Sequence, residues 1–245
     1  CKENKLFGDE IDLTKLPVPW IHHGDGGRYI NTYGIFIAAT PDGKWVNWAI
    51  SRAMLDGPRT IAGVVIPTQD FGKIYARWKE IGKEMPFALC LGVDPAIAMI
   101  AGYPLPSGVS EGEMMGGWYK EPVDVVKCET NDLLVPASTE IVIEGLASLD
   151  EKVPEGPMGE YGGYVWSGRS QQVPCFKVTA MTHRDDPIMP LCVAGVPTEE
   201  NHTNWGISIA ASIQNVLRRQ GFPIKECFIP MESAAHWFVV SVDRN

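Results

Sequence analysis

The sequence predicts an α+β fold, with a central antiparallel β-barrel in residues 1–185 and the start of an α/β domain in residues 186–245. Short apolar runs bounded by Gly and Pro recur along the first part with few helical segments between them, which favours an antiparallel barrel over a doubly wound sheet. After Asp185-Asp-Pro187 the pattern changes to one long helix and two strands. Because this second part is short and the chain begins at Cys1, we expect a piece of a longer protein.

The first strands follow an irregular start that is rich in Pro and Gly. Residues 33–40 are almost continuously apolar and are expected to form a buried strand. The turn residues Pro41-Asp-Gly43 predict that residues 45–51 return beside it as the second strand of a hairpin. Residues 60–66 are rich in β-branched side chains and form the next expected strand.

Helices are expected after these strands. Residues 70–83 place apolar side chains at i, i+3, i+7 and i+10 from Phe71, which predicts an amphipathic helix. After a strand at 87–91, Asp94-Pro95 marks the start of a short helix that ends at residue 101. Ser110 and Glu113 have the spacing of a capping box. The remaining expected elements are strands at 123–128, 139–146, 164–166 and 176–182, a helix at 203–219, and strands at 224–229 and 237–242.

Composition excludes several classes of protein. The 245 residues are 45% apolar and 21% charged, which is ordinary for a globular protein with a full core. A net charge of -9 without any basic cluster argues against a nucleic acid partner. No apolar run approaches the ~20 residues that span a bilayer, so no membrane partner is expected. The six cysteines include no C-x-x-C pair, which argues against a zinc ribbon and suits a cytoplasmic protein with reduced thiols.

Two carboxylates lie close together in Glu155-Gly-Pro-Met-Gly-Glu160, where two glycines and a proline predict a turn. Of two acids on a glycine-rich loop, one can act as a proton donor and the other can adjust the pKa of that donor. A solvated surface turn is the commoner explanation of this spacing. The strand at 45–51 is followed by Arg52, whose guanidinium could meet the pair.

A set of short motifs resembles the UbiD family of reversible decarboxylases, which act on aromatic and α,β-unsaturated acids. The motifs occur in the family's order over nearly the whole chain, and the set is far more specific than any one of them. They are Asn47-Trp-Ala-Ile-Ser-Arg52, Ile66-Pro-Thr-Gln69, Gly108-Val-Ser-Glu111, Lys127-Cys-Glu-Thr-Asn-Asp132 and Glu155-Gly-Pro-Met-Gly-Glu160. The resemblance implies that the barrel is a split β-barrel like that of flavin reductases, with α/β regions before and after it.

The resemblance also implies a prenylated FMN cofactor with a divalent metal, manganese or magnesium, on its phosphate. Asn47 and Glu111 match two metal ligands of the family. The third ligand in relatives is a histidine that follows a glutamine, and here Asp70 follows Gln69. Since an aspartate oxygen suits a hard cation, Asp70 is expected either to complete the metal site or to cap the helix that begins there.

A potassium ion near the phosphate is a further implied cofactor. Ala101 and Gly102 lack the hydroxyls that several relatives carry, so backbone carbonyls such as that of Trp48 would have to hold this ion. Trp205 matches a variable pocket position or is a core aromatic residue, and His183 and His202 are expected to be structural. The cofactor-binding positions that the resemblance implies are Asn47, Ala49, Ile50, Ser51, Arg52, Gln69, Asp70, Ala101, Gly102, Tyr103, Pro104 and Glu111.

The function implied by the resemblance is the reversible, non-oxidative decarboxylation of an aromatic, heteroaromatic or α,β-unsaturated acid, in a homo-oligomeric enzyme. Arg52 would bind the substrate carboxylate, Glu160 would donate a proton to carbon, and Glu155 would be the partner of Arg52. One alternative is a split-barrel FMN oxidoreductase, although the chain lacks the nicotinamide motif G-x-G-x-x-G. The other is a non-catalytic UbiD-like subunit, against which the intact arginine and glutamates argue.

Overall fold

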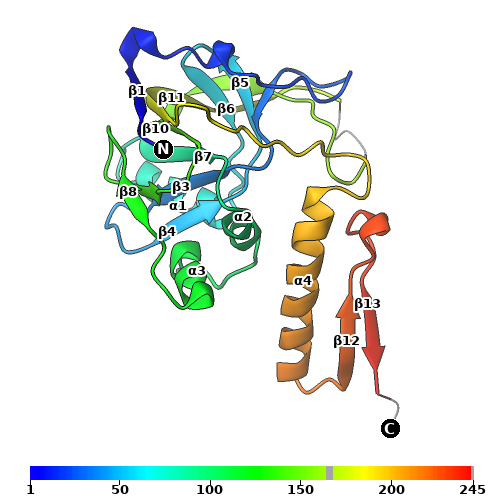
Figure 1. Ribbon diagram of the computed structural model, residues 1–245. Coiled ribbons are helices and arrows are strands. Elements are labelled where there is room, and N and C mark those ends of the chain that lie inside the picture. The colour runs from blue at the N-terminus through cyan, green and yellow to red at the C-terminus, as the bar shows by residue number, and fades with distance from the viewer. Residues whose placement is uncertain (164–167, 244–245) are drawn as a thin grey trace.

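The computed structural model describes residues 1–163 and 168–243, and a curled antiparallel sheet forms its centre (Figure 1). The strands of this sheet are β1 (Asn4–Phe7), β2 (Tyr29–Asn31), β3 (Ile35–Ala39), β4 (Val46–Ala49), β5 (Ala53–Gly57), β6 (Thr60–Gly63), β7 (Met85–Leu91), β10 (Ile141–Glu155) and β11 (Gln171–His183). Their order is β2-β5-β6-β11-β10-β7-β3-β4, and β1 pairs with β11. The sheet therefore curls as a half-barrel from β2 to β4.

Both faces of this sheet are covered, which explains why its strands are continuously apolar rather than alternating. On β3, Phe36 and Ala38 belong to one buried cluster, whereas Ile35 and Ile37 belong to a second cluster on the opposite face. The first cluster includes residues of α1 (Asp70–Glu80). The second is closed by α2 (Pro95–Ala101), α3 (Glu111–Tyr119) and the small sheet of β8 (Val125–Lys127) and β9 (Leu134–Pro136).

Four phenylalanines form the centre of the first cluster. The rings of Phe87 and Phe176 meet edge to face with centroids 4.8 Å apart, and Phe36 lies 5.5 Å from Phe176. Phe71 of α1 stacks on Phe176 with centroids 6.3 Å apart and lies 5.5 Å from Phe36. This contact fixes the start of α1 against the sheet, and the residues just before α1 line the site described below.

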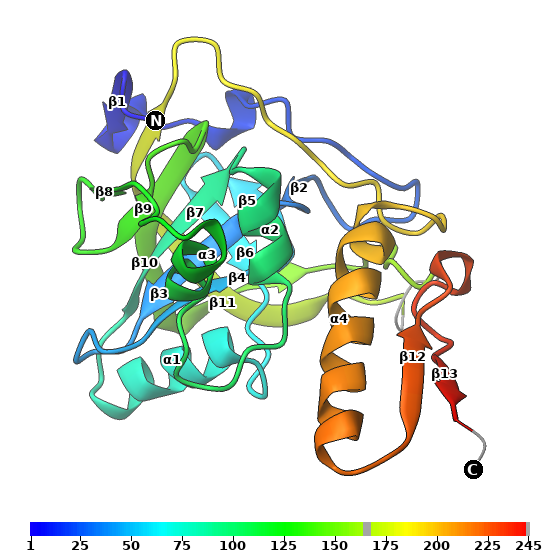
Figure 2. The same cartoon turned by 60° about the horizontal axis from the view of Figure 1, so that its bottom comes forward.

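The last part of the chain lies to one side of the sheet. It consists of α4 (Glu200–Arg219) and an antiparallel pair, β12 (Ile224–Phe228) and β13 (Val239–Val242). Figures 1 and 2 show β12 and β13 lying along α4, with only the first turns of α4 near the sheet and α2. Short 3-10 turns occur at η1 (Gly8–Glu10), η2 (Leu13–Lys15) and η3 (Met231–Ser233).

Most expected elements are present, with some differences. The stretch expected to be irregular contains the strands β1 and β2, and β5 and β9 were not expected. Glu155 is the last residue of β10, paired with Gln171, rather than part of a turn. Ser110 does precede α3, but its hydroxyl accepts from Val46 N at 3.3 Å instead of bonding the helix, so the capping box is wrong. The strand expected at 164–166 lies outside the described residues.

All six cysteines are free thiols. Within residues 1–163 and 168–243, each helix is too short or too polar to cross a membrane.

Candidate active site

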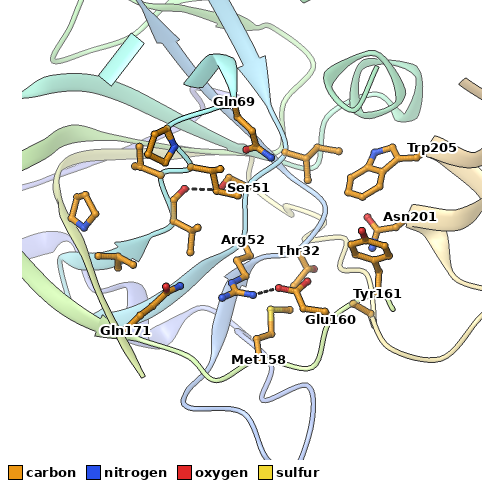
Figure 3. Close-up of a pocket in the computed structure, with 18 of the residues that line it drawn as sticks. Thr32, Ser51, Arg52, Gln69, Met158, Glu160, Tyr161, Gln171, Asn201 and Trp205 are labelled. Carbon is orange, nitrogen blue, oxygen red and sulfur yellow. Dashed lines mark hydrogen bonds and ion pairs between the residues drawn. The ribbon is translucent and has the colours of Figure 1, made fainter. Parts of the chain in front are cut away.

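Arg52 lies between β4 and β5 and reaches both glutamates of the predicted pair (Figure 3). Its Nη2 donates to Glu155 Oε2 at 3.0 Å, and its Nε makes an ion-pair contact with Glu155 Oε1 at 3.0 Å. Its Nη1 contacts Glu160 Oε1 directly. The structure therefore brings Arg52 to two glutamates that lie 103 and 108 residues further along the chain, as the sequence analysis expected.

The two glutamates have different surroundings. Glu155 is fully buried and also accepts from the Tyr29 hydroxyl at 2.8 Å and from Gln171 Nε2 at 2.9 Å. Burial, together with the Glu155 charge, raises the pKa of Tyr29, so this phenol stays a donor. Glu160, by contrast, has a side chain that is 20% exposed and lines an open cavity. Glu155 is thus a fixed acceptor, and Glu160 is the acid within reach of a ligand.

Two adjoining cavities contain the expected cofactor positions. The larger, of about 590 Å³, lies beside Arg52 and Glu160, and the smaller, of about 410 Å³, lies beside α1 and α2. Ile50, Gln69 and Trp205 line both cavities. The larger is also lined by Ser51 and Arg52, and the smaller by Asn47, Ala49, Asp70, Ala101, Gly102, Tyr103, Pro104 and Glu111. Every position that the resemblance implies for the cofactor therefore lines this hollow.

Asn47 and Glu111 form a buried pair in the smaller cavity. Asn47 Nδ2 donates to Glu111 Oε1 at 2.9 Å, and Trp48 N donates to Glu111 Oε2 at 2.7 Å. Among the described residues, the buried Asn47 Oδ1 finds no hydrogen-bond donor. Burial raises the pKa of Glu111 to about 7. An unpartnered amide oxygen beside a buried carboxylate fits a divalent cation that prefers oxygen ligands.

Asp70 lies in the same cavity but is already engaged. Its Oδ1 accepts from Lys73 Nζ at 2.7 Å and from Ser107 Oγ at 3.1 Å. It is the first residue of α1, and Gln69 occupies the N-cap position, so the expected capping role is wrong. Asp70 therefore fits a metal less completely than Asn47 and Glu111, because Lys73 already compensates its charge.

Trp205 closes the hollow from the side of α4. A side chain at Gly102 would place its Cβ 1.9 Å from Trp205 Nε1, so the indole packs directly on that glycine. The Trp205 ring meets Tyr161 edge to face at 5.8 Å, next to Glu160 (Figure 3). Of the two expectations for Trp205, its place in the lining of both cavities favours the pocket position.

The histidines expected to be structural make structural contacts. His202 is buried, its Nδ1 accepts from Glu199 N at 3.1 Å, and its Nε2 donates to Tyr161 O at 3.0 Å. His183 ends β11 and bonds Arg184 O at 2.6 Å, with no residue of the two cavities among its described contacts. Tyr29 and Gln171 were missed by the sequence analysis because nothing in their spacing connects them to Glu155.

Comparisons with known proteins show the family of the chain. The model of the family UbiD, described as 3-octaprenyl-4-hydroxybenzoate carboxy-lyase Rift-related domain, matches residues 1–197. The chain is 49% identical to pyrrole-2-carboxylic acid decarboxylase of Pseudomonas aeruginosa, over 99% of this chain and 49% of that protein. It is 44% identical to ferulic acid decarboxylase 1 of Saccharomyces cerevisiae, again over 99% of this chain and 49% of that protein.

A solved structure shows the same fold. The UbiD-class enzyme HmfF from Pelotomaculum thermopropionicum, in an evolved dimeric form with prFMN, has a TM-score of 0.91 to this chain. The identity is 31%, covering 100% of this chain and 56% of that one. The chain belongs to the UbiD family. It spans about half the length of the curated relatives it matches.

Proposed function

We propose that this chain is the cofactor-binding part of a carboxy-lyase that reversibly decarboxylates an aromatic, heteroaromatic or α,β-unsaturated acid. The observation that carries the proposal is the Arg52 guanidinium held by Glu155 and Glu160 at the edge of a cavity. Two similar proteins are named as decarboxylases, and HmfF is described with prFMN, which supports prenylated FMN as the cofactor. Residues 1–185 would form the flavin reductase-like split barrel, and residues 186–245 the start of an α/β domain.

Arg52 has donors left for a substrate carboxylate. Glu155 lies against the Nε and Nη2 edge of the guanidinium, with a hydrogen bond from Nη2 and an ion-pair contact at Nε. The Nη1 and Nη2 edge faces Glu160 and retains N–H groups, since a guanidinium has five donors in a fixed fork. A substrate carboxylate would share this second edge, so Arg52 would orient the acid while Glu155 keeps the guanidinium in place.

Glu160 is the better proton donor of the two acids. A proton on Glu155 would have to displace one of the donors from Tyr29, Gln171 or Arg52. Glu160 has one such donor, Arg52 Nη1, among its described contacts, and it borders the cavity. Glu160 would therefore deliver the proton to the carbon that loses CO₂, and it would remove that proton in the reverse direction.

The smaller cavity would hold the phosphate end of the cofactor. Asn47, Glu111 and Asp70 would bind manganese or magnesium there, and the Trp48 carbonyl would contribute to a potassium site. When bound, prenylated FMN would supply the electron sink for the charge left on carbon. The residues of the chain would bind the acid, orient it and move one proton. Orientation alone can lower the activation barrier of a reaction by as much as about 7–11 kcal/mol.

The proposal is tested with the full-length protein loaded with prenylated FMN. We expect a visible flavin spectrum and CO₂ release from at least one member of a panel of cinnamic, hydroxybenzoic and heteroaromatic acids. Loaded protein that releases CO₂ from none of them, yet oxidises NAD(P)H, would favour the oxidoreductase alternative. Gel filtration and cell fractionation would test the two accompanying predictions, a homo-oligomer and a cytoplasmic location.

A further inference from the structure

A third carboxylate, Asp25, lies behind the loop that carries Glu160. Its side chain is completely buried, although it belongs to a stretch that the sequence analysis expected to be irregular. It accepts from Gly159 N at 2.9 Å, from His22 N at 2.9 Å and from His22 Nδ1 at 3.1 Å. The first of these bonds fixes the residue immediately before Glu160, from a position 134 residues away in the chain.

The His22 ring is wedged between two segments of the site. Its Nδ1 faces Asp25, and its Nε2 contacts Ala194 O, which belongs to a residue that lines the larger cavity. A Cβ at Gly159 would lie 2.7 Å from His22 Nδ1, and one at Gly195 would lie 3.1 Å from Nε2. Neither loop could therefore carry a side chain at these positions without displacing the ring.

The backbones of the two loops are also joined directly. Gly26 N donates to Pro157 O at 2.7 Å, and a Cβ at Gly26 would lie 2.0 Å from Gly156 O. On the other side of Glu160, Tyr161 O accepts from His202 Nε2 at 3.0 Å. Glu160 is thus flanked by an anchored amide before it and an anchored carbonyl after it.

We infer that Asp25 and His22 are positioning residues for Glu160. The inference rests on the proposed function, in which Glu160 transfers a proton. In the described parts of the chain neither residue lines either cavity, so their effect passes through Gly159. A loop with glycines on both sides of Glu160 has little conformational preference of its own, and a displacement of about 1 Å at a reacting group can cost about 100-fold in rate.

The test compares Asp25→Asn with wild type in the full-length holoenzyme. Asparagine has the same size as aspartate. Its amide cannot accept hydrogen bonds from Gly159 N and both His22 donors as strongly as a carboxylate does. We expect kcat to fall by about tenfold or more with KM changed less than about threefold, because Arg52 still binds the substrate. The flavin spectrum should be retained. His23→Gln, a change at the exposed neighbour of His22, is the matched control.

A second readout requires no turnover. Hydrogen exchange of the Gly159 amide should be faster in Asp25→Asn than in wild type, because its acceptor is weakened. His22→Asn and His22→Gln separate the two ring contacts, since the asparagine amide nitrogen replaces Nδ1 and that of glutamine replaces Nε2. We expect His22→Asn to retain more kcat than His22→Gln, because it can still orient Asp25.

The outcomes are distinct. Unchanged kcat and unchanged Gly159 exchange in Asp25→Asn would overturn the inference, and so would equal losses in both His22 variants. If Asp25→Asn does not fold, Gly159→Ala applies the same test, because its new Cβ displaces the His22 ring. Wild-type holoenzyme that releases no CO₂ would overturn the proposed function alone, while the exchange measurement would still decide whether Asp25 anchors the loop.

Discussion

Asn47 and Glu111 are joined by a 2.9 Å hydrogen bond that leaves the Asn47 Oδ1 atom without a donor in the described parts of the chain. The amide orientation is set by this bond, because its Nδ2 must face the carboxylate. Its oxygen then points elsewhere in a buried site, where an unpaired acceptor costs about 1–3 kcal/mol. A cation would accept the Asn47 oxygen as a ligand and so remove this cost. Its positive charge would also offset the energetic cost of burying the Glu111 carboxylate.

The first prediction concerns metal content. Glu111→Gln keeps the size of the side chain but removes the charge, so manganese affinity should fall by more than the roughly 10–100-fold seen when an outer-shell partner is lost. Elemental analysis of the purified protein measures this. Glu113→Gln, on the exposed side of the same helix turn, should leave the metal content unchanged. Equal metal in both variants would remove Glu111 from the ligand set.

The second prediction is a pH dependence of the metal-free protein. The folded state holds the Glu111 proton with a pKa of about 7 rather than 4.5. The raised pKa of Glu111 therefore contributes fully to the free energy of unfolding below about pH 4.5. This contribution is lost as the pH rises through about 7. We expect the free energy of unfolding to fall by up to about 3 kcal/mol more between pH 5 and 8 in wild type than in Glu111→Gln. Added Mn²⁺ should restore stability at pH 8, and parallel curves for the two proteins would contradict the assignment.

The third prediction concerns Asp70. If its carboxylate is a metal ligand, Asp70→Ala should release flavin during gel filtration, because the cation anchors the phosphate. Lys73→Met is the control, since it removes the partner of Asp70 but no ligand. Unchanged flavin absorbance in Asp70→Ala would show that Asp70 is not a metal ligand. Its role would then be limited to the hydrogen bonds with Lys73 and Ser107.

The fourth prediction separates binding from chemistry. Glu160→Gln should retain the flavin spectrum and lower kcat by about 100- to 10,000-fold, the usual contribution of a positioned proton donor. The amide can still accept from Arg52, so the carboxylate site is kept. Full activity in this variant would exclude Glu160 as the donor.

The fifth prediction concerns stability. Tyr29→Phe removes a donor from the buried Glu155 and should lower the free energy of unfolding by about 1–3 kcal/mol. Tyr75→Phe removes a hydrogen bond to Ser148 O that lies outside the two cavities. Urea unfolding should show the larger loss for Tyr29, and only this variant should also lose activity, because Glu155 holds Arg52.

Turn residues and apolar spacing correctly predicted the elements that depend on neighbouring residues in the sequence. The hairpin of β3 and β4 follows from a Pro-Asp-Gly turn between two apolar runs, and its register pairs Phe36 with Ala49. Helix α1 follows from its apolar spacing. By contrast, β2 and β5 are too short to show a clear period. β5 forms a hairpin with β6, but β2 pairs only with β5, more than 20 residues further along the chain. Pairing with β11 likewise extends β10 as far as Glu155, despite the neighbouring glycine.

The same distinction applies to the site. Motif order identified the residues that line the hollow, and it placed Arg52 near both acids. It did not identify Tyr29 or Gln171, which reach Glu155 only because the curled sheet brings β2 and the start of β11 to the end of β10. The sequence analysis also did not pair Lys73 with Asp70, although the i, i+3 spacing of the two residues on α1 permits an ion pair.

Strand β11 lies in the middle of the large sheet, although it is the last of that sheet's strands to leave the ribosome. Before it emerges, β2-β5-β6 and β10-β7-β3-β4 can each assemble during translation, but β6 and β10 have nothing to join them. Arg52 lies between β4 of one group and β5 of the other, and the two acids end β10 or follow it. The hollow is therefore completed only when β11 is inserted and α4 brings Trp205 against it. Under the proposed function, flavin loading would therefore follow synthesis of the chain at least as far as Trp205.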